Sequence, residues 1–152
     1  MKISSFAVIA ALALTTAALA QEKKIERKDL PPAVEKTVTA QSQGAIIKGF
    51  SQERENGQTN YEAEMMVDGH SKDVLISPAG AVVEVEEQVS LDSLPVAVKQ
   101  VLQTKAGAGK IVKVESLTKH DKLVAYEAVV QTSGKKKEIQ VGPDGEKLAH
   151  EE

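Results

Sequence analysis

The side chains of this chain with the most capacity for chemistry are carboxylates that alternate with apolar residues between positions 62 and 86. Alternation with a period of two places such residues on one face of a β-strand. A face that mixes acidic and apolar side chains is typical of an interaction surface. The sequence therefore predicts a binding surface made of Glu62, Glu64, Met66, Asp73, Leu75, Val82 and Glu84, with Glu86 on the same phase.

Two other interpretations of these residues stay open. They can form an ordinary solvated sheet face, or the seam between two halves of the chain. Carboxylates in this number can also hold a hard cation such as calcium, which needs several oxygen ligands at once. No loop has the Asp-x-Asp-x-Asp-Gly pattern of a calcium site, so the sequence assigns no metal ligands.

The chain lacks the motifs of the common enzyme classes. It has no Gly-x-Ser-x-Gly, no His-Glu-x-x-His and no glycine-rich phosphate loop, and it contains no cysteine. His70, His120 and His150 have no second histidine at ligand spacing, which is typical of surface histidines. We therefore expect a protein that is not an enzyme, with no catalytic residues and no cofactor.

The first 20 residues have the pattern of a secretory signal peptide. Lys2 gives a basic start, an apolar run follows from Phe6 to Leu19, and Ala18-Leu19-Ala20 is a small-x-small cleavage signal. The apolar run is shorter than the roughly 20 residues that a membrane span needs. We expect a periplasmic or secreted protein with no membrane span after cleavage, beginning with a charged segment over residues 21–28.

The charge balance argues against a nucleic-acid partner. Without Lys2, the chain has 18 Lys and Arg against 22 Asp and Glu, a net charge of −4. A nucleic-acid binder instead shows a concentrated basic patch. The one basic run, Lys135-Lys136-Lys137, falls where a turn enters a strand, and it is interpreted as a solvated edge.

The part of the chain after residue 28 is written twice, with the second copy 64 to 65 residues after the first. Leu30-Pro31 recurs as Leu94-Pro95, and Tyr61-Glu62-Ala63 recurs as Tyr126-Glu127-Ala128. The offset grows by one residue between these anchors, which we place near Gly107–Gly109. A period of this size indicates a duplicated supersecondary unit. The predicted units cover residues 29–88 and 89–152.

Each unit begins with a predicted helix. Leu30, Val34 and Val38 have helical spacing after a proline, and Leu94, Val98 and Leu102 repeat the pattern. Asp29 and Ser93 lie near the expected caps, because a short polar side chain satisfies free helix N–H groups.

Four strands with period-two patterning follow each helix. In the first unit they cover Ile46 to Arg54, Tyr61 to Val67, Ser71 to Ser77 and Ala81 to Glu87. In the second they cover Ile111 to Lys119, Tyr126 to Thr132, Lys136 to Gly142, and Glu146 onwards. Turn signals such as Asp68-Gly69 and Ser133-Gly134 favour antiparallel neighbours. The predicted fold class is α+β: two tandem units, each one helix followed by a four-stranded antiparallel meander, with the helices on one sheet face and with Tyr61 and Tyr126 in the core.

These motifs resemble the PepSY-like domains of bacterial envelope proteins, which are related in fold to the β-lactamase inhibitory proteins. The resemblance rests on the Leu-Pro helix, the Tyr-Glu-Ala strand, and the Asp-Gly and Pro-Asp-Gly turns, in tandem behind a signal peptide. It implies a non-catalytic protein that binds or restrains another envelope or secreted protein. The mature chain has one Phe, two Tyr, no Trp and no Cys, so inhibition of a β-lactamase itself is not expected.

The function predicted from the sequence is therefore that of an exported, non-enzymatic binding module. Its expected partner is an envelope or secreted protein or peptide, bound through a sheet face or a sheet edge in the manner of an inhibitor. The alternative is a module of the cell envelope that senses a small ligand or a metal ion.

Overall fold

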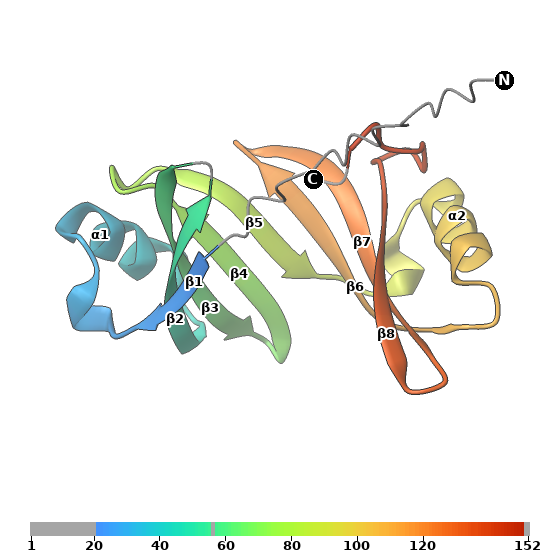
Figure 1. Cartoon of the computed structure of the whole chain (residues 1–152), viewed down its shortest axis with the longest axis horizontal. Coiled ribbons are helices and arrows are strands. Elements are labelled where there is room, and N and C mark those ends of the chain that lie inside the picture. The colour runs from blue at the N-terminus through green and yellow to red at the C-terminus, as the bar shows by residue number, and fades with distance from the viewer. Residues whose placement is uncertain (1–20, 56, 151–152) are drawn as a thin grey trace, which may run out of the picture.

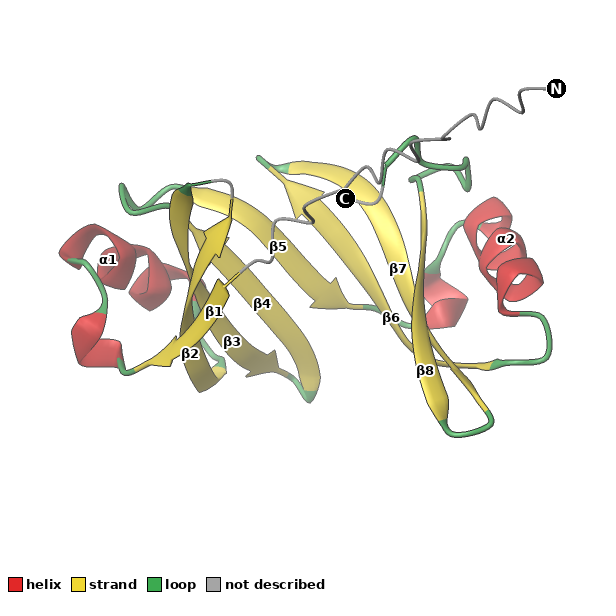
Figure 2. Ribbon diagram, in the orientation of Figure 1, coloured by secondary structure: helices red, strands yellow, loops and turns green. Residues whose placement is uncertain are grey.

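The computed structural model describes residues 21–55 and 57–150, so the predicted signal peptide lies outside the described residues. These residues form one eight-stranded antiparallel sheet in which the strands follow one another in sequence order (Figure 1). The strands are β1 Gln21–Ile25, β2 Ile46–Glu55, β3 Gln58–Val67, β4 His70–Ile76, β5 Val82–Gln88, β6 Lys110–Lys119, β7 Lys122–Thr132 and β8 Lys135–Val141. The helices are α1 Pro32–Gln41 and α2 Val96–Ala106, and Figure 2 shows them at opposite ends of the molecule.

The element order shows how the duplicated sequence is built. The series β1, α1, β2, β3, β4 recurs as β5, α2, β6, β7, β8, with a short 3₁₀ turn before each helix. Ile25 of β1 pairs with Phe50, and the equivalent Val89 donates its N–H to the carbonyl of Val114 (2.9 Å). Because β5 also pairs with β4, the two units join edge to edge in one sheet. The predicted fold class, α+β with two helix-then-strands units, is confirmed.

Three details of the strands differ from the prediction. β1 was expected only as a charged segment, and it becomes a strand because it pairs with β2. The fourth strand of the second unit is not formed, since residues 146–150 contain no strand. The turn before it is formed in both copies, but Val82 and Val83 then continue as β5, whereas the second copy has Lys147 and Leu148. β-Branched residues favour strands, which explains the difference.

The extra residue of the second copy also lies elsewhere than expected. The pairing of β6 with β7 shifts between Leu117 and Thr118, whose partners are Ala125 and Leu123, so Val124 is the inserted residue. It forms a β-bulge, which adds one residue to a strand without changing the pairing beyond it. The offset of the repeat therefore changes in β7 and not near Gly107–Gly109.

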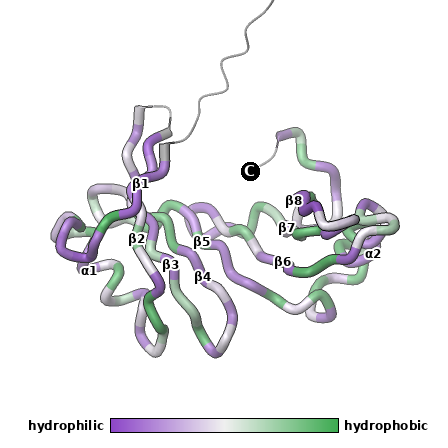
Figure 3. Tube along the Cα trace, turned by 60° about the horizontal axis from the view of Figure 1, so that its bottom comes forward, coloured by the Kyte–Doolittle hydropathy of each residue, from purple (hydrophilic) through white to green (hydrophobic). Residues whose placement is uncertain are grey.

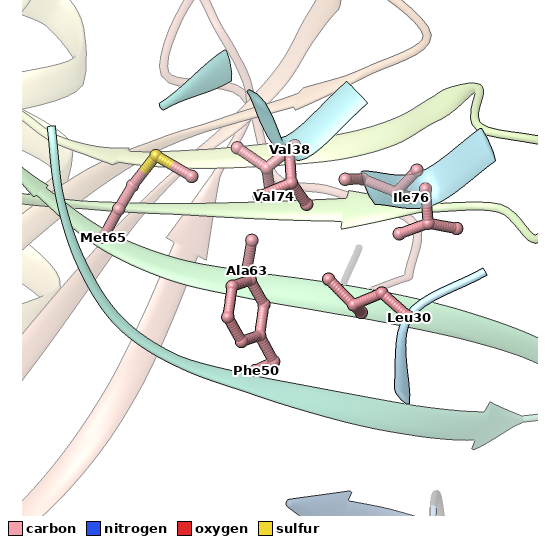
Figure 4. Close-up of a cluster of buried hydrophobic side chains, with 8 residues drawn as sticks. Leu30, Val38, Phe50, Ala63, Met65, Val74 and Ile76 are labelled. Atoms are coloured by element: carbon pink, nitrogen blue, oxygen red, sulfur yellow. The ribbon is translucent and has the colours of Figure 1, made fainter. Parts of the chain in front are cut away.

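Each helix buries one stripe of apolar side chains against the sheet. Val34 and Val38 of α1 are fully buried in a cluster with residues of β2, β3 and β4, and Figure 4 shows this cluster: Leu30, Val38, Phe50, Ala63, Met65, Val74 and Ile76. Val98 and Leu102 of α2 form a second cluster with Val114, Ala128 and Val141. As predicted, Tyr61 packs against the first cluster and Tyr126 against the second.

Proline starts both helices, although the caps differ from those predicted. Pro31 and Pro95 are the N-cap residues, and Asp29 and Ser93 belong to the preceding 3₁₀ turns. Asp29 accepts a hydrogen bond from the Glu26 N–H (3.0 Å), so it caps the turn and not the helix. The fixed φ of proline suits a helix start.

Candidate binding face

The sheet face opposite the helices carries most of the predicted binding residues. Since side chains alternate along a strand, the neighbours of buried Ala63 and Val74 point away from the helices. Cross-strand pairing places Glu64 opposite Asp73, and Asp73 opposite Glu86. Pairing in the adjacent row places Leu75 between Glu62 and Glu84. We call this surface the carboxylate face; its residues are Glu53, Glu62, Glu64, Asp73, Leu75, Glu84, Glu86, Glu115 and Glu127.

Figure 3 shows hydrophilic residues along the central strands β5 and β6, where the two units meet. The face is therefore polar in the middle of the sheet, where a buried core otherwise lies on both sides of a strand.

Two predicted site residues lie apart from this group. Val82 packs against the α1 cluster, because a register shift between Leu75 and Ile76 turns the start of β5 toward the helix side. Met66 lies at the far end of β3, where it pairs with Ser71 and Ile46, and it is half-buried. The structure therefore brings together five of the seven predicted residues: Glu62, Glu64, Asp73, Leu75 and Glu84.

The carboxylate face contains a small hollow. Its volume is about 190 Å³, and its lining residues are Glu53, Glu62, Asp73, Leu75, Glu84 and Glu86. Binding sites for drug-sized molecules are usually about 300–1,000 Å³ and mostly apolar. A hollow this small and this acidic suits a cationic group better than a small apolar molecule.

Burial and mutual repulsion perturb the carboxylates of this face. Burial raises the pKa of Glu86 to about 8, and the charges of Glu115, Glu84, Glu127 and Asp73 act in the same direction. Burial also raises the pKa of Glu62 to about 7, although a hydrogen bond from Ser51 opposes the rise. The pKa values of Asp73 and Glu127 are raised too, in both cases mainly by burial. Charged carboxylates are therefore held here at an electrostatic cost.

Few cations offset this charge within the described residues. Lys113 contacts Glu115 (2.5 Å), and Lys119 lies 3.7 Å from Glu84. The other ion pairs of the described chain lie in the segments around the two helices: Arg27 with Glu35, Lys28 with Glu26, and Lys99 with Asp92. The centre of the carboxylate face thus has a clear excess of negative charge.

Sequence analysis missed two buried polar residues of this face. Ser51 is 0% exposed and Glu115 is 5% exposed, and they occupy equivalent positions of β2 and β6. Ser51 donates to Glu62 Oε2 (2.8 Å), whereas Glu115 accepts from the Ser71 hydroxyl (3.3 Å). Both flank a buried apolar residue, Phe50 or Val114, and this alternation was the available signal.

Three of the carboxylates lie close enough to share a cation. Oxygen atoms of Asp73, Glu86 and Glu115 lie within 4.8 Å of one another, and they come from β4, β5 and β6. An oxygen set of this kind has the chemistry that calcium prefers. The site therefore lies across the joint between the two units.

No helix within residues 21–55 and 57–150 is both long and apolar enough to cross a membrane.

Comparison with known proteins supports the fold through solved structures alone. No protein-family model matches the chain. No curated protein matches it either. A BLIP-like protein from Bacteroides fragilis is 23% identical, with a TM-score of 0.57 over 81% of this chain and 86% of that one.

Two further structures agree with this assignment. A protein assigned to the periplasm of Bacteroides eggerthii is 18% identical, with a TM-score of 0.62 over 77% of this chain and 84% of that one. A DUF2874 family protein from Bacteroides uniformis is 17% identical, with a TM-score of 0.59 over 76% of this chain and 84% of that one. The chain thus has the BLIP-like, DUF2874 fold that the PepSY-like resemblance implied, and the similar structures indicate no enzyme family.

Proposed function

We propose that this chain is an exported, non-enzymatic binding protein whose carboxylate face holds a basic segment of another envelope or secreted protein. The observation that carries the proposal is the crowding of half-buried carboxylates around the joint between the units, with raised pKa values for Glu62, Asp73 and Glu86. A cationic group placed among them relieves the repulsion and favours the charged carboxylates. Binding energy is therefore available to a partner that supplies Lys or Arg.

The shape of the face favours a protein partner. The acidic residues are spread over strands β3 to β7, while the hollow among them has a volume of only about 190 Å³. Leu75 adds an apolar contact between Glu62 and Glu84. A surface that combines several charges with an apolar centre suits a polypeptide that inserts one basic side chain and lies across its neighbours.

The fold and composition refine the kind of binding. A BLIP-like fold supports an inhibitor-like role, in which the bound protein is restrained. However, the two tyrosines of this chain pack against the helix-side clusters, so the carboxylate face lacks their rings. Binding hot spots are commonly Trp, Tyr and Arg. Affinity therefore comes mainly from charge, and it weakens as salt rises.

The predicted export also has structural support. β1 begins at Gln21, the residue after the expected cleavage site, and it forms the first strand of the sheet. We expect the protein purified from the cell envelope to begin at Gln21, as N-terminal sequencing will show.

The binding proposal is tested by capture from an envelope extract at two salt concentrations. The test variant combines Glu64→Lys with Leu75→Asp and should lose the captured partner. Gln103→Lys, on the exposed side of α2, makes the same net change of charge and should keep it. Equal capture by the test variant and the native chain means that the carboxylate face is not the binding surface.

A second candidate function is a metal-ion sensor, and the spacing of Asp73, Glu86 and Glu115 favours it. Calorimetric titration with calcium, zinc and copper separates the two functions. Stoichiometric binding at about micromolar affinity, lost in Glu115→Gln, replaces the protein-binding proposal. Absence of binding leaves the basic partner as the ligand of this face.

A further inference from the structure

The outer edge of β8 has a counterpart inside the molecule. β8 is the last strand of the sheet in the described chain, and it is equivalent to β4, which ends the first unit. The edge of β4 is occupied by β5. The structure therefore already shows which kind of strand this repeat position accepts.

The register of β4 with β5 defines the chemistry of the accepted strand. Lys72 pairs with Glu87, and Val74 pairs with Val85. The equivalents of Lys72 and Val74, 65 residues later, are Lys137 and Ile139. A strand bound in the same way places an acidic residue opposite Lys137 and an apolar residue opposite Ile139.

Charge on β8 favours an acidic occupant. Lys135, Lys136 and Lys137 are all exposed. None of them takes part in an ion pair with another described residue. Lysines on an edge protect it from indiscriminate strand pairing, and they also select for a strand of opposite charge.

The C-terminal segment approaches this edge without pairing to it. The Gly142 N–H donates to the Glu146 carbonyl (2.9 Å), as the Ser77 N–H does to Ala81 (2.8 Å), so the turns that follow β4 and β8 agree. Residues 147–150 then line a hollow of about 240 Å³ together with Glu138, Ile139, Gln140 and Lys105. Figure 1 shows this segment leaving the end of β8.

A side chain holds part of the edge in place of a strand. Lys105 Nζ donates to the carbonyl of Gln140 (3.1 Å) from the exposed end of α2. A flexible lysine is displaced more easily than a paired strand, because it gives up one hydrogen bond where a strand gives up a ladder.

We propose that the outer edge of β8 binds an extended acidic segment of a partner protein as a ninth strand, in the register that β5 adopts on β4. This is β-strand addition, in which backbone hydrogen bonds supply affinity and alternate side chains supply specificity. The site is separate from the carboxylate face and takes the opposite charge.

A second copy of this chain is a poor occupant. β1 is the equivalent of β5, and the same register places its Lys23 opposite Lys137 and its Glu22 opposite Glu138. Like charges directly opposite each other destabilise a strand pair. The edge therefore selects a different protein and opposes head-to-tail growth of the sheet.

The probe for this site is a peptide with blocked ends and the sequence of residues 81–90, Ala-Val-Val-Glu-Val-Glu-Glu-Gln-Val-Ser. We expect it to bind the ¹⁵N-labelled mature chain, with amide shifts in NMR spectra confined to β8 and the residues beside it. A peptide with all three glutamates changed to lysine should bind about tenfold more weakly. Replacing Lys135, Lys136 and Lys137 with glutamate should reverse that preference.

Three further measurements identify the mode of binding. N-methylation of alternate peptide amides should abolish binding, because it removes the donors of the ladder. A chain that ends at Gly145 should bind a few times more tightly, because residues 147–150 no longer line the edge. The Glu64→Lys, Leu75→Asp variant should bind the peptide as the native chain does, so the two sites fail separately.

Three outcomes overturn the proposal. The first is absence of binding at about 1 mM peptide, below which strand addition has no useful affinity. The second is an NMR shift map centred on another strand. The third is binding that survives N-methylation, which would indicate attraction between charges without a ninth strand.

Discussion

The two units of this protein agree on one side of the sheet and differ on the other. On the helix side, Val34 and Val38 correspond to Val98 and Leu102, and all four are buried. On the opposite side, the Ser51 position holds Glu115, and the Glu64 position holds Val129. The duplication has thus kept what folding needs and changed what a partner meets.

The difference follows from the physics of the two sides. A helix-side residue contacts the core, so a change of volume or polarity costs stability at once. A residue on the other side contacts water and a few strand neighbours, so its chemistry is free to change. The carboxylates concentrate where the units meet, because β5 contributes Glu84 and Glu86 beside residues of both units.

The largest expected effect tests whether the two helix-side cores are equivalent. Leu102→Ala should lower the free energy of unfolding by about 3 kcal/mol, and Val38→Ala by about 2 kcal/mol, since both side chains are fully buried. Urea unfolding followed by far-UV circular dichroism measures both values. A single transition in each variant is expected because β4 pairs with β5. Two separate transitions would show that the units fold independently.

The next effect separates two turns that the sequence writes alike. Gly80 and Gly145 both have positive φ, +84° and +86°, and each lies under the start of a helix. A Cβ at Gly80 would lie 2.7 Å from the Ala33 carbonyl oxygen, whereas at Gly145 the nearest atom of Ala97 lies at 3.2 Å. Gly80→Ala should therefore cost about 2 kcal/mol and Gly145→Ala about 1 kcal/mol. Equal losses in thermal unfolding would contradict this reading of the two turns.

Much of the fold was predictable from the sequence because its signals are local. Prolines at the helix starts, period-two patterning and Gly turns each act within a few residues. β1 was missed because Gln21–Ile25 has no apolar alternation and becomes a strand through its pairing with β2. The fourth strand of the second unit was predicted wrongly because the turn before it is repeated while the residues after it are not.

The candidate site was predictable to the extent that strand alternation is regular. Glu62 and Glu64 lie on the expected face because β3 has no bulge at their positions in its pairing with β4. Val82 is on the opposite side because a shift between β4 and β5 reverses its phase. The burial of Glu115 was beyond sequence reasoning, since it depends on Ser71 and Lys113, which only the joined sheet brings together.

A smaller effect concerns stability against pH at the joint. The pKa of Glu86 is about 8 in the folded chain against 4.5 for an ordinary glutamate. The folded state therefore binds the extra proton between these values, so stability is full below pH 4.5 and is lost as pH rises through 8. Glu86→Gln should match the native chain near pH 4.5 and exceed its stability by about 1–2 kcal/mol near pH 9.

Urea unfolding at several pH values measures this difference. Glu26→Gln is the matched control, because Glu26 is exposed and lies outside the carboxylate face. A native chain whose stability does not fall between pH 5 and pH 9 would show that the joint tolerates the charge on Glu86.

The smallest effect tests the equivalent positions Ser51 and Glu115 directly. The Ser51 hydroxyl donates to Glu62 and holds the pKa of that carboxyl below the value that burial alone would produce. Ser51→Ala should therefore raise the pKa of Glu62 further above 7, by less than about one unit, since one hydrogen bond to a charged group is lost. An NMR titration of the Glu62 side chain measures the shift. Ser71→Ala is the control, because Ser71 donates to Glu115 on the other side of the joint and should leave Glu62 unchanged. A fall in the pKa of Glu62 in Ser51→Ala would mean that water replaces the hydroxyl, and the first unit would then tolerate its buried carboxylate without a protein donor.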